Sequence, residues 1–256
     1  MVTDQFSVGM EVGGGFDFEF SADTYNSLID GAMMAAPALG VWKIGTEDIS
    51  YTLEKEFTDL TANHFLQYSG ERVGEFDIGF AFGEPVAGSF GMAGATVKSA
   101  SISLVGAGSV AAPTTTRIMN AVSDLSGIII DGVAFSGCLS EVQLNINNNL
   151  RPAECIGSAT PSDQILGTAE VTGSISAHLT DTTIQWYTEQ VINQTKFEIE
   201  FTITDGTTTY KFHIPNARIS GDSPMAEGIN TDVMVEIEFL ALYDETEGSS
   251  LVITKS

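Results

Sequence analysis

The chain has 256 residues, with 34 acidic and 10 basic side chains and a formal net charge of −24 at pH 7. This length suffices for one or two domains with a buried core, and the 43% hydrophobic content excludes a disordered acidic chain. A sequence pI near 4.1 excludes binding to the phosphate backbone of nucleic acid, because such binding needs clustered lysine and arginine. Repulsion of nucleic acid remains compatible with this charge.

Cysteine content and the N-terminus predict a soluble, cytosolic protein with reduced thiols. Cys138 and Cys155 are too few for the disulfide framework of a small secreted domain. The first residues, MVTDQFSVGMEVGGG, lack a basic flank followed by an apolar stretch. No run approaches the ~18–20 apolar residues that span a bilayer, so no membrane association is expected.

The first predicted elements are a strand and a helix. Residues 16–20 (FDFEF) alternate between phenylalanine and a carboxylate, which places the rings on one face of a sheet and the acids on the other. Residues 23–36 (DTYNSLIDGAMMAA) have an apolar stripe at helical spacing, and Pro37 ends the predicted helix.

The middle of the chain, residues 98–132, is rich in alanine, serine and threonine and contains Pro113. We predict a connector with one or two edge strands that projects as an arm. The run GAGSVA at 106–111 superficially fits a dinucleotide fingerprint, but the Ala-Pro-Thr that follows breaks the helix such a site needs. We interpret this run as a loop.

The second half returns to strand patterns. A strand is predicted at 142–147, and a short helix at 183–193 follows a threonine cap. Residues 197–214 alternate on both sides of Asp205-Gly206, which predicts a hairpin with a short loop. Residues 233–239 predict one more strand, so the fold class is mainly β, with antiparallel sheet, short packing helices and one solvated acidic face.

The two halves share an order of strand, helix, hairpin and strand, which predicts an internal duplication. Three pairs of segments align without gaps: 14–29 with 173–188, 64–74 with 210–220, and 86–93 with 233–240. We divide the chain accordingly into a first half at 1–97, the connector at 98–132 and a second half at 133–256.

No motif for catalysis, metal binding or cofactor binding is found. His64, His178 and His213 occur singly in strand patterns, and neither cysteine lies in a CxxC pair. No serine lies in a nucleophile elbow. We therefore predict no catalytic residue, no metal site and no cofactor, and not an enzyme.

Carboxylates on the predicted strands form the candidate functional surface. The candidate residues are Glu198, Glu200, Glu236, Glu238, Asp17 and Glu19. A plain solvated face is one interpretation. With ten basic residues available, however, few of the acids can be neutralised, and like charges opposite one another destabilise a sheet. An anionic surface kept for a function is the other interpretation.

The sequence resembles the tail tube proteins of long-tailed bacteriophages over about residues 11–255. The N-terminal segments that carry the resemblance are GGGFDFEFSADTYNSLIDGAMMA and SYTLEKEFTDLTANHFLQYSGERVGEFDIGFAFGEPVAGSFGMAG. Those of the second half are AAPTTTRIMNAVSDLSGIIIDG, SEVQLNINNNLRPAECIGS, LGTAEVTGSISAHLTD and DVMVEIEFLALYDETEGSSLVITKS. One departure is the strand at 142–147, which has at most the short equivalent DQFSVGMEV before the first half.

The resemblance implies a tail-tube β-sandwich or barrel fold without catalysis. It implies self-assembly into rings that stack as a hollow tube in the virion tail, assembled in the host cytoplasm. The expected partners are other copies of the chain, in a ring of three with pseudo-sixfold symmetry or a ring of six, and the tape measure, tail terminator and tail tip proteins. Genomic DNA is expected to pass through the tube without specific binding, and the six candidate carboxylates are expected to face its lumen.

Two predictions refine this picture and one alternative competes with it. Ring formation predicts that strand edges are completed between neighbouring subunits, and that residues 98–116 contact an adjacent ring or subunit. The alternative function is a carbohydrate- or receptor-binding β-sandwich module of a viral tail. Such sites expose aromatic platforms, whereas Trp42 and Trp186 lie in apolar-patterned segments.

Overall fold

The computed structural model describes residues 9–61, 64–105, 110–193, 195–220 and 232–256. The strands before residue 101 are β1 (Val12–Glu19), β2 (Val41–Lys43), β3 (Tyr51–Phe57), β4 (His64–Ala81), β5 (Ala87–Gly94) and β6 (Thr96–Ala100). The later strands are β7 (Leu125–Ile130), β8 (Val133–Ala134), β9 (Leu139–Asn147), β10 (Arg151–Pro152), β11 (Gln164–Ile165), β12 (Glu170–His178), β13 (Phe197–Thr204), β14 (Thr209–Ser220), β15 (Met234–Ala241) and β16 (Val252–Lys255). The helical segments are α1 (Asn26–Met33), α2 (Asp181–Tyr187) and the π-helical turn η1 (Thr188–Ile192).

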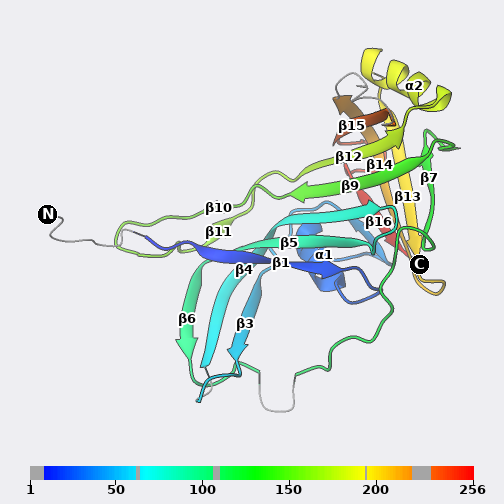
Figure 1. Cartoon of the computed structure of the whole chain (residues 1–256). Coiled ribbons are helices and arrows are strands. Elements are labelled where there is room, and N and C mark those ends of the chain that lie inside the picture. Colours follow the sequence, from blue (N-terminus) through cyan, green and yellow to red (C-terminus); the bar gives the residue numbers. More distant parts are fainter. Residues whose placement is uncertain (1–8, 62–63, 106–109, 194, 221–231) are drawn as a thin grey trace, which may run out of the picture.

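Within the described ranges, 14 strands form one antiparallel sheet, and β10 and β11 form a separate pair. The main path of the sheet runs β1-β5-β4-β9-β12-β15-β14-β13-β7-β8. Strand β16 pairs with β14 and β2, while β3 and β6 pair with β4. The predicted mainly β class is confirmed, and Figure 1 shows β1, β4 and β5 at one end of the sheet and β13, β14 and β16 at the other.

The sheet folds back on itself around an apolar core. Phe80 on β4 packs edge-to-face against Phe201 on β13, with ring centroids 5.0 Å apart, and lies 6.2 Å from the ring of Phe212 on β14. Strands that are distant in the sheet order therefore face each other across the core, as in a β-sandwich. It follows that the outward side chains of β4 and β13 point away from each other.

The predicted hairpin at 197–214 is confirmed as β13 and β14. Phe201 and Phe212 are cross-strand partners in this pair, with stacked rings 4.9 Å apart. In the loop, Gly206 adopts a φ of 92°, and the carboxylate of Asp205 accepts hydrogen bonds from the N–H groups of Thr207 and Thr208 at 2.8 and 2.7 Å. An Asp-Gly pair suits this turn, because the short acid bonds the backbone ahead of it and glycine tolerates a positive φ.

The first helix is shorter than predicted. The structure places α1 at Asn26–Met33 instead of 23–36. Asp23 has a φ of 66°, which precludes a start at that residue, and Met34 has a φ of 49° and ends the helix before Pro37. The apolar stripe predicted a helix correctly, but local backbone geometry determines its ends.

The second helical segment begins two residues earlier than predicted. Thr180 is its N-cap: its hydroxyl accepts from the Thr183 N–H at 3.2 Å, and Thr183 Oγ1 accepts from the Thr180 N–H at 2.6 Å. This reciprocal pair is a capping box. Trp186 on α2 packs edge-to-face against Phe135 and Phe197, so the helix covers the core beside β13.

The predicted connector at 98–132 contains the end of β6 and all of β7. In the described residues β6 pairs with β4 alone, while β7 lies between β13 and β8. Residues 106–109, in the glycine-rich run, lie outside the described residues.

Two parts of the chain extend from the sandwich (Figure 1). Strands β3 and β6 flank the first part of β4, and beyond Gly70, with a φ of 72°, β4 pairs with β5 instead of β6. The second extension lies between β9 and β12 and contains β10 and β11. It meets the N-terminal side of β1, where the Met10 N–H donates to the carbonyl of Ala159 at 2.7 Å.

Tyr210 joins α1 to β14, and its hydroxyl provides a testable contribution to stability. The side chain is fully buried; Oη donates to Asn26 Oδ1 at 2.8 Å and accepts from the Asp23 N–H at 3.0 Å. We expect Tyr210→Phe to lower the free energy of unfolding by about 1–2 kcal/mol, since both partners lose a hydrogen bond. Urea denaturation measures this, and Tyr243→Phe, at a side chain that is 67% exposed, is the control and should be neutral.

Candidate functional site

The outward face of β1, β5, β4, β9, β12 and β15 is a continuous polar surface. Cross-strand partners share a face, so the register connects its members across the sheet. One row runs from Asp17 through Ser89 and Asp77 to Asn145. A neighbouring row starts at Glu19 on β1 and reaches Glu238 on β15, five strands away along the sheet path.

Carboxylates dominate this surface, which we call the acidic face. Its acidic residues are Asp17, Glu19, Glu75, Asp77, Glu141, Glu170, Glu236 and Glu238. None of them forms an ion pair within the described part of the chain. The alternation in the sequence predicted four of these eight acids.

Neutral amide and hydroxyl groups, not cations, hold several of these carboxylates. Asn145 Nδ2 donates to Asp77 Oδ1 at 2.6 Å and to Glu75 Oε1 at 3.2 Å. Gln143 Nε2 donates to Glu141 Oε1 at 2.6 Å. Such bonds fix the positions of the side chains and leave their negative charge unneutralised by any cation of the described chain.

The six predicted residues fall into two groups. Asp17, Glu19, Glu236 and Glu238 lie on the acidic face. Glu198 and Glu200 lie on β13, in the opposite layer, and each is paired with a basic group on β14. His213 Nε2 is 2.9 Å from Glu198 Oε1, and Lys211 Nζ is 2.6 Å from Glu200 Oε2. The alternation identified the outward side of each strand correctly but not which layer the strand belongs to.

Four acids of the face were missed: Glu75, Asp77, Glu141 and Glu170. The signal was present for most of them, because Glu75 and Asp77 alternate with buried Phe76 and Ile78 in β4. In β9 the same period of two directs Glu141 to the outward face, away from the core-facing residues of the strand.

An open strand edge borders the acidic face. Strand β1 pairs with β5 on one side, and on its other side it has no strand partner among the described residues. The exposed backbone groups of such an edge can pair with another strand. Gly13, Gly14 and Gly15 lie in this strand, so bulky side chains do not block the approach of another backbone.

Little in the structure resembles a site for small molecules. In the described ranges there is no group of three or more His, Cys, Asp or Glu side chains that could hold a metal ion. Trp42 and Trp186 are 1% and 7% exposed, so neither offers the aromatic platform that the carbohydrate-binding alternative needs. Cys138 and Cys155 are exposed free thiols. No helix of the described chain has the length and apolar character needed to cross a membrane.

The fold and this surface describe a structural β-protein: an antiparallel sandwich with one wide acidic face and an open strand edge. The family model for phage tail tube proteins matches residues 1–241, and the chain belongs to that family. Its class is therefore a structural component of the virion tail, in a family that is structural and not enzymatic. A comparison with curated proteins finds no match.

Proposed function

We propose that three copies of the chain close into a ring with pseudo-sixfold symmetry, and that these rings stack into a hollow tail tube with the acidic face lining its lumen. Phage DNA leaves through this lumen. Asp17, Glu19, Glu236 and Glu238 are the lumen residues in this proposal. Glu198 and Glu200 are not included, because their layer faces the opposite way and both are paired with basic groups.

The equal strand register of the two halves is the observation that supports this proposal most strongly. The order β1-β5-β4 in the first half corresponds to β12-β15-β14 in the second. The sequence alignment pairs Phe16 with Ile175 and Phe90 with Ile237. The first-half residues Phe16 and Phe90 are cross-strand partners, and so are Ile175 and Ile237.

A second register match lies one strand further along. The alignment places Arg72 on Arg218 and Ala93 on Leu240. Arg72 pairs with Ala93, and Arg218 pairs with Leu240. Agreement at two separate strand junctions supports a tandem duplication, and a duplicated chain needs three copies for six equivalent positions.

The junction between the halves suggests how copies join. Strand β9 pairs with β4 of the first half on one edge and with β12 of the second half on the other. By the duplication, β1 is the equivalent of β12, and its corresponding edge is open. We infer that a strand of the neighbouring copy completes this edge, which closes the sheet into a ring.

The charge of the acidic face suits the passage of DNA. Duplex DNA carries one negative charge per ~1.7 Å, so a cationic wall would bind it. A wall of unpaired carboxylates repels the phosphates, and the ~8 Å Debye length at physiological salt confines this repulsion to a layer near the wall. The DNA can then move without adhering.

Contacts between rings are assigned to the connector. Its described part exposes large apolar side chains: Ile102, Leu104, Val105 and Val110 are 78%, 54%, 40% and 76% exposed. Exposed apolar groups in one segment favour a protein contact. We propose that residues 98–116 contact an adjacent ring or subunit, while tape measure, terminator and tip proteins contact the finished tube.

Electron microscopy of the assembled protein tests the proposed ring. Three lobed pairs in end-on views, with a ring mass of three chains, are expected. Six equal lobes, each one chain, would overturn the trimer. A reconstruction with Glu236 and Glu238 on the outer surface would overturn the assignment of the lumen.

A proline pair tests the open edge of β1. Successive N–H groups of a strand point to opposite edges, so among Gly15→Pro and Phe16→Pro one variant removes a bond to β5 and the other removes a donor of the open edge. We expect the variant that removes the open-edge donor to retain most of the monomer's stability and yet fail to assemble. If the variant without the open-edge donor folds and assembles normally, the edge is not an interface.

A further inference from the structure

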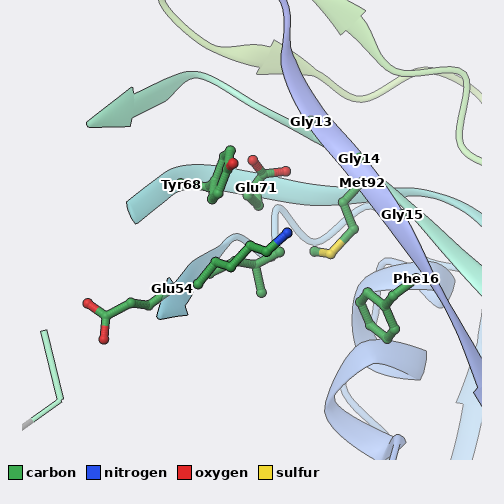
Figure 2. A pocket seen from close by; sticks show the side chains of 10 residues that line it. Gly13, Gly14, Gly15, Phe16, Glu54, Tyr68, Glu71 and Met92 are labelled. Atoms are coloured by element: carbon green, nitrogen blue, oxygen red, sulfur yellow. The ribbon is translucent and has the colours of Figure 1, made fainter. Parts of the chain in front are cut away.

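A cavity of about 400 Å³ lies on the core side of the glycine-rich part of β1, next to the open edge. Its walls include Gly14 and Phe16 of β1, Leu53 of β3, Met92 of β5, and Tyr68 and Glu71 of β4. Figure 2 shows the Glu71 carboxylate between Tyr68 and the glycines of β1. The lining is mainly apolar, and its charged members are Glu54, Lys55 and Glu71.

Glu71 has no partner in this cavity. The residue is 1% exposed, and neither carboxylate oxygen has a hydrogen-bond partner among the described residues. Burial raises the pKa of this carboxyl, because it disfavours the charged form. A Cβ at residue 94 would collide with Glu71 Oε1, so Gly94 provides space for the carboxylate.

Three charged residues beside Glu71, in the cavity lining or next in the chain, have contacts other than with Glu71. Arg72, the next residue, contacts Asp48 and Asp163. Lys55 lines the cavity, but its Nζ lies 5.6 Å from the centroid of the Phe57 ring, and no Lys55–Glu71 ion pair forms in the described chain. Glu54 turns away from the cavity (Figure 2), and its carboxylate accepts from Ser103, Gln67 and the Leu104 N–H.

An unpartnered buried carboxylate is costly unless a cation or donor joins it. The cavity can hold an alkyl chain along Leu53 and Met92, and the rings of Phe16 and Tyr68 can pack against a cationic head group. A Cβ at Gly14 would meet nothing within 4 Å, so the wall toward β1 leaves open space.

We propose that this cavity receives a lysine or arginine side chain from a second copy of the chain, which pairs with Glu71. The inference rests on the proposed assembly. Charge complementarity favours this occupant. The chain has a net charge of −24 and only 10 lysine and arginine residues, so an unpartnered acid in one copy is a selective site for a lysine or arginine of another copy. Outside the cavity, four basic residues lack an ion pair within the described part of the chain: Lys98, Arg151, Lys196 and Arg218.

The first test compares Glu71→Gln with Glu56→Gln, which removes an exposed charge on neighbouring β3. We expect Glu71→Gln to leave the monomer at least as stable as the wild type. It should raise the critical concentration for assembly roughly tenfold or more, because one charge-assisted hydrogen bond between copies is lost. Glu56→Gln should change neither. Equal assembly of the two variants would overturn the inference and leave the proposed tube intact, whereas a wild-type chain that never assembles overturns the tube itself.

A charge exchange identifies the donor. Glu71→Lys should block assembly, and combining it with a change to glutamate at one of the four unpaired basic residues should restore it. Restoration by none of them would overturn the second copy as the source. A double-mutant cycle with Lys55→Met tests the competing partner: coupling between Lys55 and Glu71 in the stability of the monomer would assign the acid to its own chain and overturn the inference.

Discussion

We expect Phe201→Ala to lower the free energy of unfolding by about 3–5 kcal/mol, the largest effect of any single substitution considered for this chain. Phe201 is 1% exposed and lies where the two layers meet, against Phe80 of the first half and Phe212 of the second. Truncation removes ring contacts on both sides and leaves a cavity that tightly packed neighbours cannot fill.

Urea denaturation followed by tryptophan fluorescence measures this effect, with Phe82→Ala as the control. Phe82 follows β4 and is 79% exposed, so the same truncation should cost less than about 0.5 kcal/mol. Because Phe80 and Phe201 are in contact across the core, we expect a single unfolding transition, and Phe201→Ala should shift this whole transition to lower urea concentration. Two transitions, of which Phe201→Ala moves one alone, would contradict this coupling.

The second large effect is expected at Arg72. Its side chain is 7% exposed; the guanidinium contacts Asp48 Oδ2 at 2.7 Å and Asp163 Oδ1 at 2.7 Å, and so joins the loop before β3 to the extension before β12. Arg72→Met keeps most of the apolar stem and removes both charge-assisted contacts. We expect a loss of about 2–3 kcal/mol at pH 7, less than for a fully enclosed pair, because both aspartates are half-exposed and can be hydrated.

The loss at Arg72 should depend on pH. The hydrogen bond from Arg72 holds the pKa of the Asp48 carboxyl below its ordinary value. A lowered folded-state pKa means that this stability is present above the unfolded-state value of about 3.9, and is lost as the pH falls through the folded-state pKa. The difference between wild type and Arg72→Met should therefore be largest near neutral pH and shrink below about pH 4.

Arg218→Met is the matched control for this experiment. Arg218 occupies the position that the proposed duplication aligns with Arg72, but it is exposed and has no ion pair within the described residues. We expect a change below about 0.5 kcal/mol at either pH. An equal loss for both arginines, or a difference at Arg72 that grows as the pH falls, would contradict the proposed role of the Asp48 and Asp163 contacts.

The sequence determined the strands β1, β9 and β15, the hairpin of β13 and β14, and half of the acidic face. Alternation with a period of two is local: it follows from the opposite directions of successive side chains in a strand, so Asp17, Glu19, Glu236 and Glu238 were correctly placed outward. The Asp205-Gly206 turn was equally readable, because its conformation depends on those residues themselves.

The tertiary structure alone decided how these faces combine. Nothing in the pattern of β13 indicates that it lies opposite β4, which turns Glu198 and Glu200 away from the acidic face and toward Lys211 and His213. Arg72 and Arg218 are equivalent in sequence pattern, yet only Arg72 is buried, by loops distant along the chain. The lack of a hydrogen-bond partner for the buried Glu71 carboxylate is decided in the same way. Burial and ion pairing depend on contacts between residues distant in the sequence, which no local period encodes.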